Sequence, residues 1–175
     1  MARVIMTCGK ICCGKSTYAR KIKEETKAVI LSIDDIMLTF FPEGAGEMHD
    51  ALVLRAEQYL LALSIQITDT GTDAILDWGL WTREQRERIR QYYRRHGVET
   101  EMHYLRISRS EWEKRIRTRN GQHSGHDYYV DEGLIRKVER LFEEPSPEEV
   151  DYLIDETGAV TCQKPASIKQ EKTVM

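Results

Sequence analysis

The feature that most constrains this chain is a glycine-containing stretch close to its start, RVIMTCGKICCGKSTYAR, over residues 3–20. Four of its positions match the pattern G-x-x-x-x-G-K-[ST]: Gly9, Gly14, Lys15 and Ser16. Apolar residues predict a buried strand before the motif, over Val4–Thr7, and a helix is expected after it, over Lys15–Glu25. Glycines let the backbone curl so that its N–H groups surround an anion, and the helix N-terminus adds partial positive charge. The stretch is therefore expected to bind a phosphate group.

A nucleoside triphosphate is the expected ligand of this loop. Lys15 would reach the β- and γ-phosphates, Ser16 would hold Mg²⁺ through its hydroxyl, and Thr17 would contact the α-phosphate. The expected nucleotide-binding residues are Gly9, Lys10, Cys12, Cys13, Gly14, Lys15, Ser16 and Thr17. The alternative is a glycine turn before a helix with a solvated lysine, and the order strand, loop, helix favours the phosphate loop.

Cysteines inside the loop raise the alternative of a metal or redox site. The chain has four: Cys8, Cys12, Cys13 and Cys162. Their spacing includes no C-x-x-C pair, and no histidine pair at zinc-finger spacing follows, which argues against structural zinc. We expect Cys12 and Cys13 to be small filler residues. The alternative is a thiol of lowered pKa, sensitive to oxidation, beside the helix N-terminus and Lys15.

Composition limits the possible partners of the chain. Its 26 Lys and Arg against 29 Asp and Glu give a net charge of −3, whereas a dedicated nucleic-acid-binding domain is more often basic. No apolar run approaches the roughly 20 residues that span a bilayer, and the N-terminus shows no export segment. We therefore expect a cytoplasmic protein without a membrane partner, and nucleic acid is possible but not favoured.

The 175 residues alternate short apolar runs with longer amphipathic ones, the rhythm of a doubly wound α/β domain. Strands are expected over Val4–Thr7, Ala28–Ile33, 73–78, 101–108 and 151–155. Helices are expected over Lys15–Glu25, about 52–67, about 82–96 with Gly97 as its stop, about 108–119 with a Ser108/Glu111 capping box, and 131–142. Residues 1–158 are expected to form one domain, with a mobile loop over Gly121–Gly125 and a poorly ordered tail over 159–175.

Carboxylates follow two of the expected strands. Asp34 and Asp35 come just beyond the second strand, and Asp77 ends the third. Ligand sites of doubly wound sheets lie outside the carboxyl ends of the strands, so these acids should meet the phosphate loop. Asp77 is the expected Mg²⁺ partner, and Asp34 suits a general base for an attacking hydroxyl. The alternatives are a helix cap at Asp34–Asp35 and a turn residue at Asp77.

Arginines cluster on two of the expected helices. Arg83 and Arg86 begin the helix after Asp77 and could approach a substrate. Arg115 and Arg119 are four residues apart on one helix face that leads into the Gly121–Gly125 loop. That arrangement suits a lid that closes on a triphosphate and neutralises charge in the transition state. The alternative for each arginine is a solvated surface position.

Five stretches together carry a family resemblance: the phosphate loop, SIDD, LDWGLWTREQR, RIRTRN and LFEEPSPEE. Over about Arg3 to Asp155 the chain resembles the small P-loop kinase group, AAA-type ATP-binding proteins similar to zeta toxins, chloramphenicol phosphotransferase and polynucleotide kinase domains. The resemblance implies a three-layer, adenylate-kinase-like fold with a five-stranded parallel sheet and a lid, and phosphoryl transfer from ATP with Mg²⁺. It matches Asp34 to the catalytic aspartate of the group, and Arg115 and Arg119 to its lid arginines.

The expected activity is a kinase that transfers the γ-phosphate of ATP to a hydroxyl of a small molecule, with Lys15, Asp34, Arg115 and Arg119 as catalytic residues. Polynucleotide kinases of the group usually carry an arginine shortly after the aspartate pair, and Ile36–Leu38 follow here. The alternatives are a 5′-hydroxyl polynucleotide kinase and a nucleotide-binding switch or ATP hydrolase without an acceptor. The expected acceptor pocket has an apolar lining, with a core role as the alternative for each residue: Met37, Phe40, Phe41, Trp78 and Trp81.

Overall fold

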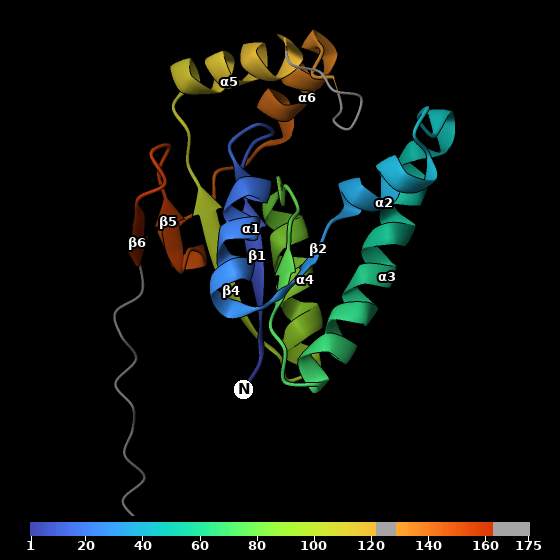
Figure 1. Cartoon of the computed structure of the whole chain (residues 1–175), viewed down its shortest axis with the longest axis vertical. Coiled ribbons are helices and arrows are strands. Elements are labelled where there is room, and N and C mark those ends of the chain that lie inside the picture. Colours follow the sequence, from blue (N-terminus) through green and yellow to red (C-terminus); the bar gives the residue numbers. More distant parts are fainter. Residues whose placement is uncertain (122–128, 163–175) are drawn as a thin grey trace, which may run out of the picture.

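The computed structural model describes residues 1–121 and 129–162 and builds them around one central sheet (Figure 1). The strand order is β2-β3-β1-β4-β5-β6. The strands are β1 (Arg3–Cys8), β2 (Val29–Leu31), β3 (Ala74–Leu76), β4 (Glu99–Leu105), β5 (Tyr152–Ile154) and β6 (Val160–Cys162). Every pair from β2 to β5 is parallel, and β6 is antiparallel to β5. The expected α/β architecture with a parallel sheet is confirmed.

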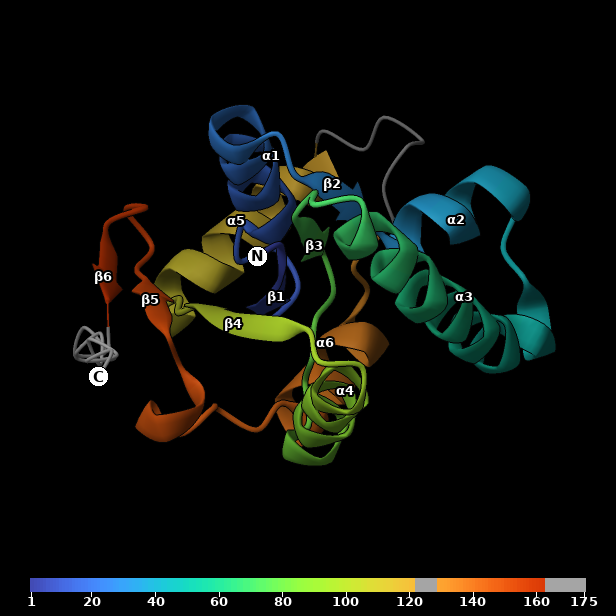
Figure 2. The same cartoon turned by 90° about the horizontal axis from the view of Figure 1, so that it is seen from below.

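Helices cover both faces of the sheet, because the strands present apolar residues on both sides. The helices are α1 (Lys15–Thr26), α2 (Ile33–Phe40), α3 (His49–Asp69), α4 (Arg83–Arg95), α5 (Arg109–Gly121) and α6 (Glu132–Leu141). Short 3₁₀ turns occur at Gly46–Met48 and Pro147–Glu149. Figure 2 shows α1 on one face of the sheet and α4 on the other. This is the three-layer arrangement expected from the sequence.

Two apolar clusters sandwich the sheet. On the α1 face, Ile5 and Ile75 pack against Ala19 and Ile22. On the other face, residues of α3 and α4, among them Leu60 and Ile89, pack against the central strands. None of the described helices is both long and apolar enough to cross a membrane.

A third cluster lies outside the sandwich, where α5 and α6 extend across the carboxyl end of the sheet (Figure 1). Its buried members are Trp112, Ile116, Val130 and Val138. Ile11 and Cys12 from the loop after β1 pack against it. The segment expected to form a lid is therefore in contact with the expected phosphate loop. The loop predicted over Gly121–Gly125 lies outside the described residues beyond Gly121.

The sheet has six strands rather than the five expected, because a tight turn after β5 returns the chain as β6. Asp155 makes this turn: its carboxylate accepts hydrogen bonds from the backbone N–H groups of Thr157 and Ala159. β6 belongs to the segment 159–175 predicted as a tail, and the rest of that segment, from Gln163 onward, lies outside the described residues. Three residues are too short a pattern to predict a strand from alternation alone.

The structure also corrects two local predictions, the end of the second strand and the capping box at Ser108. The second strand ends at Leu31 because the Ser32 hydroxyl accepts a hydrogen bond from Asp35 N–H at 3.1 Å and caps α2. The capping box at Ser108 is only half formed: its hydroxyl accepts from Glu111 N–H at 3.4 Å, whereas its own N–H donates to Glu156. The helix stop at Gly97 is confirmed, since Gly97 has a φ of 68° just after α4.

Candidate active site

The loop from Gly9 to Gly14 joins the carboxyl end of β1 to the N-terminus of α1, and its conformation requires both glycines. A side chain at Gly9 would place its Cβ 2.6 Å from Cys13 Sγ and 2.9 Å from the carbonyl oxygen of Leu105. Gly14 has a φ of 103°, a left-handed conformation that disfavours other residues. The chain therefore curls back on itself directly before a helix N-terminus, the geometry of an anion cradle.

The ammonium group of Lys15 lies inside this curl. It donates to the carbonyl oxygens of Lys10 at 2.8 Å and Gly9 at 3.3 Å. Ser16 and Thr17 follow on the first turn of α1 with exposed side chains. The loop thus presents a cation, a helix N-terminus and two hydroxyls on one side, which suits a polyphosphate and a hydroxyl-bound metal ion.

Asp34 lies close to this loop, in the first turn of α2. Desolvation by the surrounding protein raises its pKa above the usual 3.8, the negative charges of Asp77 and Asp35 raise it further, and the positive charges of Lys15 and Arg119 lower it. The Asp34 side chain is itself exposed to solvent, so the rise in its pKa is small. The charges of Lys15, Asp77 and Arg119 therefore act on Asp34, and a shared site for these four residues at the carboxyl ends of the strands stays a prediction.

The sequence left two alternatives for the acids: a helix cap at Asp34–Asp35 and a turn residue at Asp77. Ser32, not Asp34 or Asp35, supplies the capping side chain of α2, so the cap interpretation of the pair is wrong. Asp77 directly follows β3, is half-buried, and donates its backbone N–H to Leu31 at 3.1 Å. Its carboxylate is therefore held at the end of the sheet, on the same edge as the loop.

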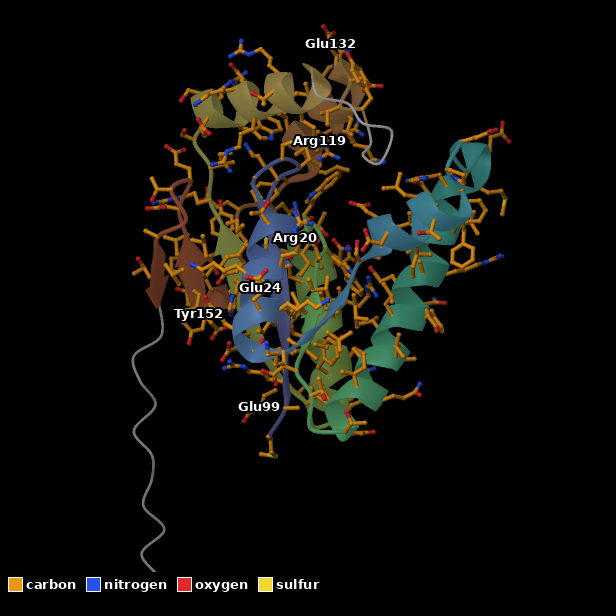
Figure 3. The ribbon with its side chains drawn as sticks, in the orientation of Figure 1. Arg20, Glu24, Glu99, Arg119, Glu132 and Tyr152 are labelled. Atoms are coloured by element: carbon orange, nitrogen blue, oxygen red, sulfur yellow. The ribbon has the colours of Figure 1, made fainter. Side chains whose placement is uncertain are left out.

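One face of α5 contacts three consecutive loop residues, a relationship that the sequence analysis missed. Trp112 Nε1 donates to the carbonyl oxygen of Ile11 at 2.8 Å, and Arg115 Nη1 donates to that of Cys13 at 3.0 Å. Between them, Arg119 Nη1 contacts Cys12 Sγ at 3.6 Å. Figure 3 shows Arg119 on the side of α5 that faces the body of the protein. The signal was the spacing of positions 112, 115 and 119, which puts all three on one helix face.

Arg115 and Arg119, both expected as lid arginines, have different surroundings. Besides Cys13, the Arg115 guanidinium binds the carbonyl oxygen of Glu156 at 2.7 Å and the carboxylate of Glu111 at 2.9 Å. Arg115 therefore joins α5, the phosphate loop and the β5–β6 turn. Arg119 contacts Cys12 of the loop, and its positive charge lowers the pKa of Asp34. The catalytic role of both stays a prediction.

The cysteines of the site are neutral thiols where they are buried. Burial raises the pKa of Cys8 to about 12 and raises that of Cys13, despite the opposing charge of Lys15. The thiol of lowered pKa considered for the loop is therefore wrong for Cys13. Cys12 is half-buried against α5. Across the described residues, no group of three or more His, Cys, Asp or Glu side chains could hold a metal ion by itself.

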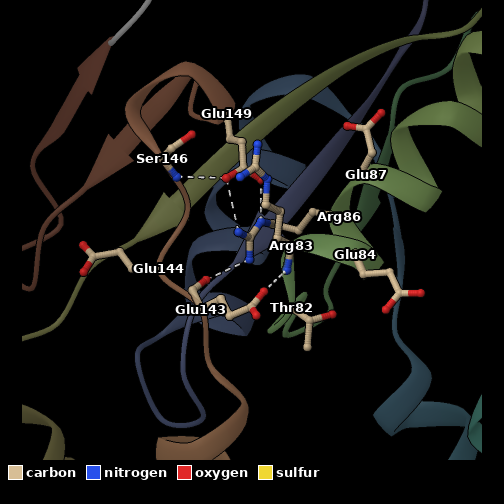
Figure 4. A pocket seen from close by; sticks show the side chains of 9 residues that line it. All are labelled: Thr82, Arg83, Glu84, Arg86, Glu87, Glu143, Glu144, Ser146 and Glu149. Carbon is tan, nitrogen blue, oxygen red and sulfur yellow. Dashed lines mark hydrogen bonds and ion pairs between the residues drawn. The ribbon is translucent and has the colours of Figure 1, made fainter.

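The arginines at the start of α4 do not join the site. Arg86 is 1% exposed, and its guanidinium is held by the carboxylate of Glu149 and by carbonyl oxygens, including that of Glu143 at 2.8 Å. It lines a groove of about 680 Å³ that Figure 4 shows from close by. Other lining residues are Thr82, Arg83, Glu84, Glu87, Glu143, Glu144, Ser146 and Glu149. Five glutamates make this groove unsuitable for a triphosphate, and Arg86 is a structural residue rather than a substrate contact.

Residues expected in the acceptor pocket divide into core and surface positions. Met37 and Trp78 are 2% and 4% exposed and belong to the core, with Trp78 Nε1 donating to the Leu31 carbonyl oxygen. Phe40 is 71% exposed, whereas Phe41 and Trp81 are half-buried. Met37 and Trp78 are thus removed from the pocket lining by their packing.

The fold is that of the small P-loop kinases. It combines a phosphate cradle between β1 and α1, a parallel sheet in the order β2-β3-β1-β4-β5, and helices that cover the loop as a lid. Residues 4–145 match the sequence pattern of the AAA domain family, and the chain belongs to that family. No curated protein sequence matches the chain.

Solved structures share this fold at low sequence identity. A putative kinase from Chloroflexus aurantiacus has a TM-score of 0.70 at 16% identity, covering 89% of this chain and 86% of its own. A sugar kinase from Janibacter sp. has a TM-score of 0.65 at 15% identity over 90% and 87% of the two chains. The APS kinase of Mycobacterium tuberculosis, in complex with AMPPNP and APS, has a TM-score of 0.64 at 15% identity over 88% of each chain. At these identities the likeness establishes the fold.

Proposed function

We propose that this protein is a cytoplasmic, ATP-dependent phosphotransferase that transfers the γ-phosphoryl group of ATP to a hydroxyl of a small molecule. The observation that carries the proposal is the loop that holds the Lys15 ammonium between β1 and α1, together with the effect of the Lys15, Asp77 and Arg119 charges on the Asp34 carboxyl. A cradle for phosphate, a carboxylate base and an arginine are the groups that phosphoryl transfer to an alcohol requires.

The nucleotide would bind with its phosphates in the loop from Gly9 to Gly14. Three features of this loop fit a phosphate. Gly9 has no side chain, the backbone at Gly14 is left-handed, and the ammonium of Lys15 lies inside the curl. Mg²⁺ would be held by Ser16 and Asp77 together with phosphate oxygens, and it would neutralise charge on the transferring group. A hydroxyl and a single carboxylate suit Mg²⁺, which usually takes few protein ligands and keeps phosphate and water oxygens.

Transfer would proceed from an acceptor hydroxyl positioned beside Asp34. As the acceptor oxygen forms its bond to the γ-phosphorus, the bond from that phosphorus to the β,γ-bridging oxygen breaks and ADP leaves. The hydroxyl proton passes to the Asp34 carboxylate. A raised pKa makes Asp34 a stronger base in its ionised form, and Lys15 and Arg119 supply positive charge near the phosphates.

A small acceptor is favoured over a nucleic acid. The net charge of −3 offers little attraction for a polyanion, and Ile36–Leu38 supply no arginine after the aspartate pair. The names of two structures that share the fold, a sugar kinase and an APS kinase, are compatible with a small acceptor.

The test is an acceptor screen with purified protein, ATP and Mg²⁺. ADP formation would be measured across nucleosides, sugars, aminoglycosides, chloramphenicol and 5′-hydroxyl oligonucleotides. We expect one small-molecule class to stimulate ADP formation and to carry the phosphate, and Asp34→Asn to abolish the stimulation. Stimulation by oligonucleotides alone would establish a polynucleotide kinase instead. ATP hydrolysis that no acceptor stimulates and that persists in Asp34→Asn would favour a switch or hydrolase.

A further inference from the structure

Two tryptophans of the segment DWGLW, at positions 77–81, differ in what their indole N–H groups bind. Trp78 Nε1 donates to the carbonyl oxygen of Leu31 at 3.0 Å. Trp81 Nε1 is also buried, but among the described residues it has no hydrogen-bond partner. An unpaired buried donor costs free energy, so such groups normally have a partner. The contrast points to a ligand that accepts the Trp81 hydrogen bond.

The Trp81 nitrogen lies next to the phosphate loop. The carbonyl oxygen of Gly79 accepts from the N–H of Gly9, the first glycine of the loop, at 3.1 Å. A Cβ added to Gly79 would lie 2.3 Å from Trp81 Nε1, so the indole nitrogen occupies the space that the missing side chain leaves. The Trp81 ring also belongs to the cluster that contains Ile11 and Cys12. The donor is thus held between the start of the loop, its tip and the lid.

The chemistry of the donor limits which ligand groups can accept its hydrogen bond. An indole N–H only donates, and the oxygens of an ionised phosphate only accept. Asp77, the expected Mg²⁺ partner, directly follows β3 and precedes Gly79 by two residues, so this segment leaves the carboxyl edge of the sheet, where ligands of such folds bind. We propose that Trp81 Nε1 donates a hydrogen bond to an oxygen of the γ-phosphoryl group of bound ATP, and that Gly79 exists without a side chain to allow it. This inference rests on the proposed function, because it requires a nucleoside triphosphate in the loop.

Trp81 would then help to distinguish ATP from ADP before transfer begins. The Gly9–Gly14 backbone contacts phosphates common to both nucleotides, and Lys15 reaches the β-phosphate as well as the γ-phosphate. The Trp81 donor instead would contact only the group that is transferred. Removal of the N–H should therefore weaken ATP binding and leave ADP binding unchanged.

The experiment is calorimetric titration of Trp81→Phe with Mg²⁺ and either ADP or a non-hydrolysable ATP analogue. Phenylalanine keeps an aromatic ring in the cluster and removes only the donor and part of the ring. We expect the affinity for the ATP analogue to fall about tenfold or more, the loss typical of a hydrogen bond to a charged group, with ADP affinity unchanged. The melting temperature of the free protein should stay equal or rise, because an unpaired donor is removed.

Trp78→Phe is the matched control within the same segment. It leaves the Leu31 carbonyl oxygen without its donor, so we expect a lower melting temperature and an unchanged ratio of ATP to ADP affinity. The two substitutions should therefore have different effects: Trp78→Phe lowers the melting temperature, and Trp81→Phe changes the ratio of ATP to ADP affinity.

Three results would overturn the inference. Equal losses for ATP and ADP would mean that the indole supports the shape of the loop. Unchanged affinity for both would mean that water or no ligand accepts the hydrogen bond, and a raised KM for the acceptor alone would assign the donor to the acceptor. In each case wild-type binding of the ATP analogue would leave the proposed function standing. Wild-type protein that binds neither nucleotide would overturn both.

Discussion

The ammonium of Lys15, the first residue of α1, donates to the carbonyl oxygen of Lys10 at 2.8 Å, across the curl of the preceding loop. A loop that already surrounds its own cation is organised for an anion before the anion arrives. Little conformational entropy then has to be lost on binding, so most of the interaction with phosphate contributes to affinity.

Lys15→Ala should remove most of the affinity for ATP while the protein stays folded. The lysine lies on the loop rather than in an apolar cluster, so its loss creates no cavity in the core. Calorimetry with ATP and Mg²⁺ measures the affinity, and circular dichroism checks the fold. Lys21→Ala, an exposed position on α1, is the matched control and should bind normally. Unchanged ATP affinity in folded Lys15→Ala would show that the loop is not the nucleotide site.

Asp34→Asn should reduce phosphoryl transfer by about a hundredfold or more, the range for loss of a general base, with ATP binding nearly unchanged. The amide keeps the size of the side chain but cannot take a proton. Single-turnover transfer to an identified acceptor measures the rate. Asp35→Asn is the control, because the neighbouring residue of the helix points in a different direction. If Asp34→Asn transfers phosphate at the wild-type rate, the base is Asp35 or the substrate itself.

Asp34→Asn should also raise the thermal stability of the free protein at neutral pH. The pKa of Asp34 is raised in the folded state above its ordinary value of 3.8, so the folded state holds this proton more tightly than the unfolded state. The stability that this group contributes is therefore full below the unfolded pKa and is lost as pH rises through the folded pKa. We expect a higher melting temperature for the variant at pH 7, and a difference that shrinks toward pH 3.5. A variant less stable than wild type at pH 7 would contradict the raised pKa.

Arg115→Ala should loosen the contact between α5 and the phosphate loop. The substitution removes three interactions, with Cys13, Glu156 and Glu111, and should lower the free energy of unfolding by about 1–3 kcal/mol. Hydrogen–deuterium exchange should rise in the loop and in the β5–β6 turn. Arg117→Ala, an exposed position on the same helix, should leave both regions unchanged. If hydrogen exchange in the phosphate loop is unaltered in the Arg115→Ala variant, Arg115 does not hold the loop in place. Its only remaining role would then be a direct one in phosphoryl transfer.

The sequence was most informative where one local pattern contains both the backbone requirement and the chemistry. The G-x-x-x-x-G-K-[ST] motif specifies two glycine conformations, a lysine and a helix start within eight residues, so the loop could be predicted without its surroundings. The acids after β2 and β3 were also predictable, because carboxyl ends of parallel strands share an edge. Gly97 ended α4 as expected, since a left-handed residue suits a helix end.

Other features depended on partners far away in the chain. Arg86 looks like any arginine of a charged helix, and only the approach of Glu149, 63 residues later, makes it a buried structural residue. The same is true of Arg115, whose partners Cys13 and Glu156 come from two distant turns. The sixth strand required the turn around Asp155, whose hydrogen bonds no alternation pattern reports.

The sequence alone therefore determined the phosphate loop, the alternation of strands and helices, and the identity of the acids at the sheet edge. These follow from backbone sterics and hydrophobic periodicity, which act over a few residues. Tertiary structure alone decided that Trp112, Arg115 and Arg119 of α5 contact the loop. It also decided that the indole N–H of Trp78 has a hydrogen-bond partner, whereas that of Trp81 has none among the described residues. Burial and hydrogen bonding depend on atoms brought together from distant segments, and no local pattern contains that information.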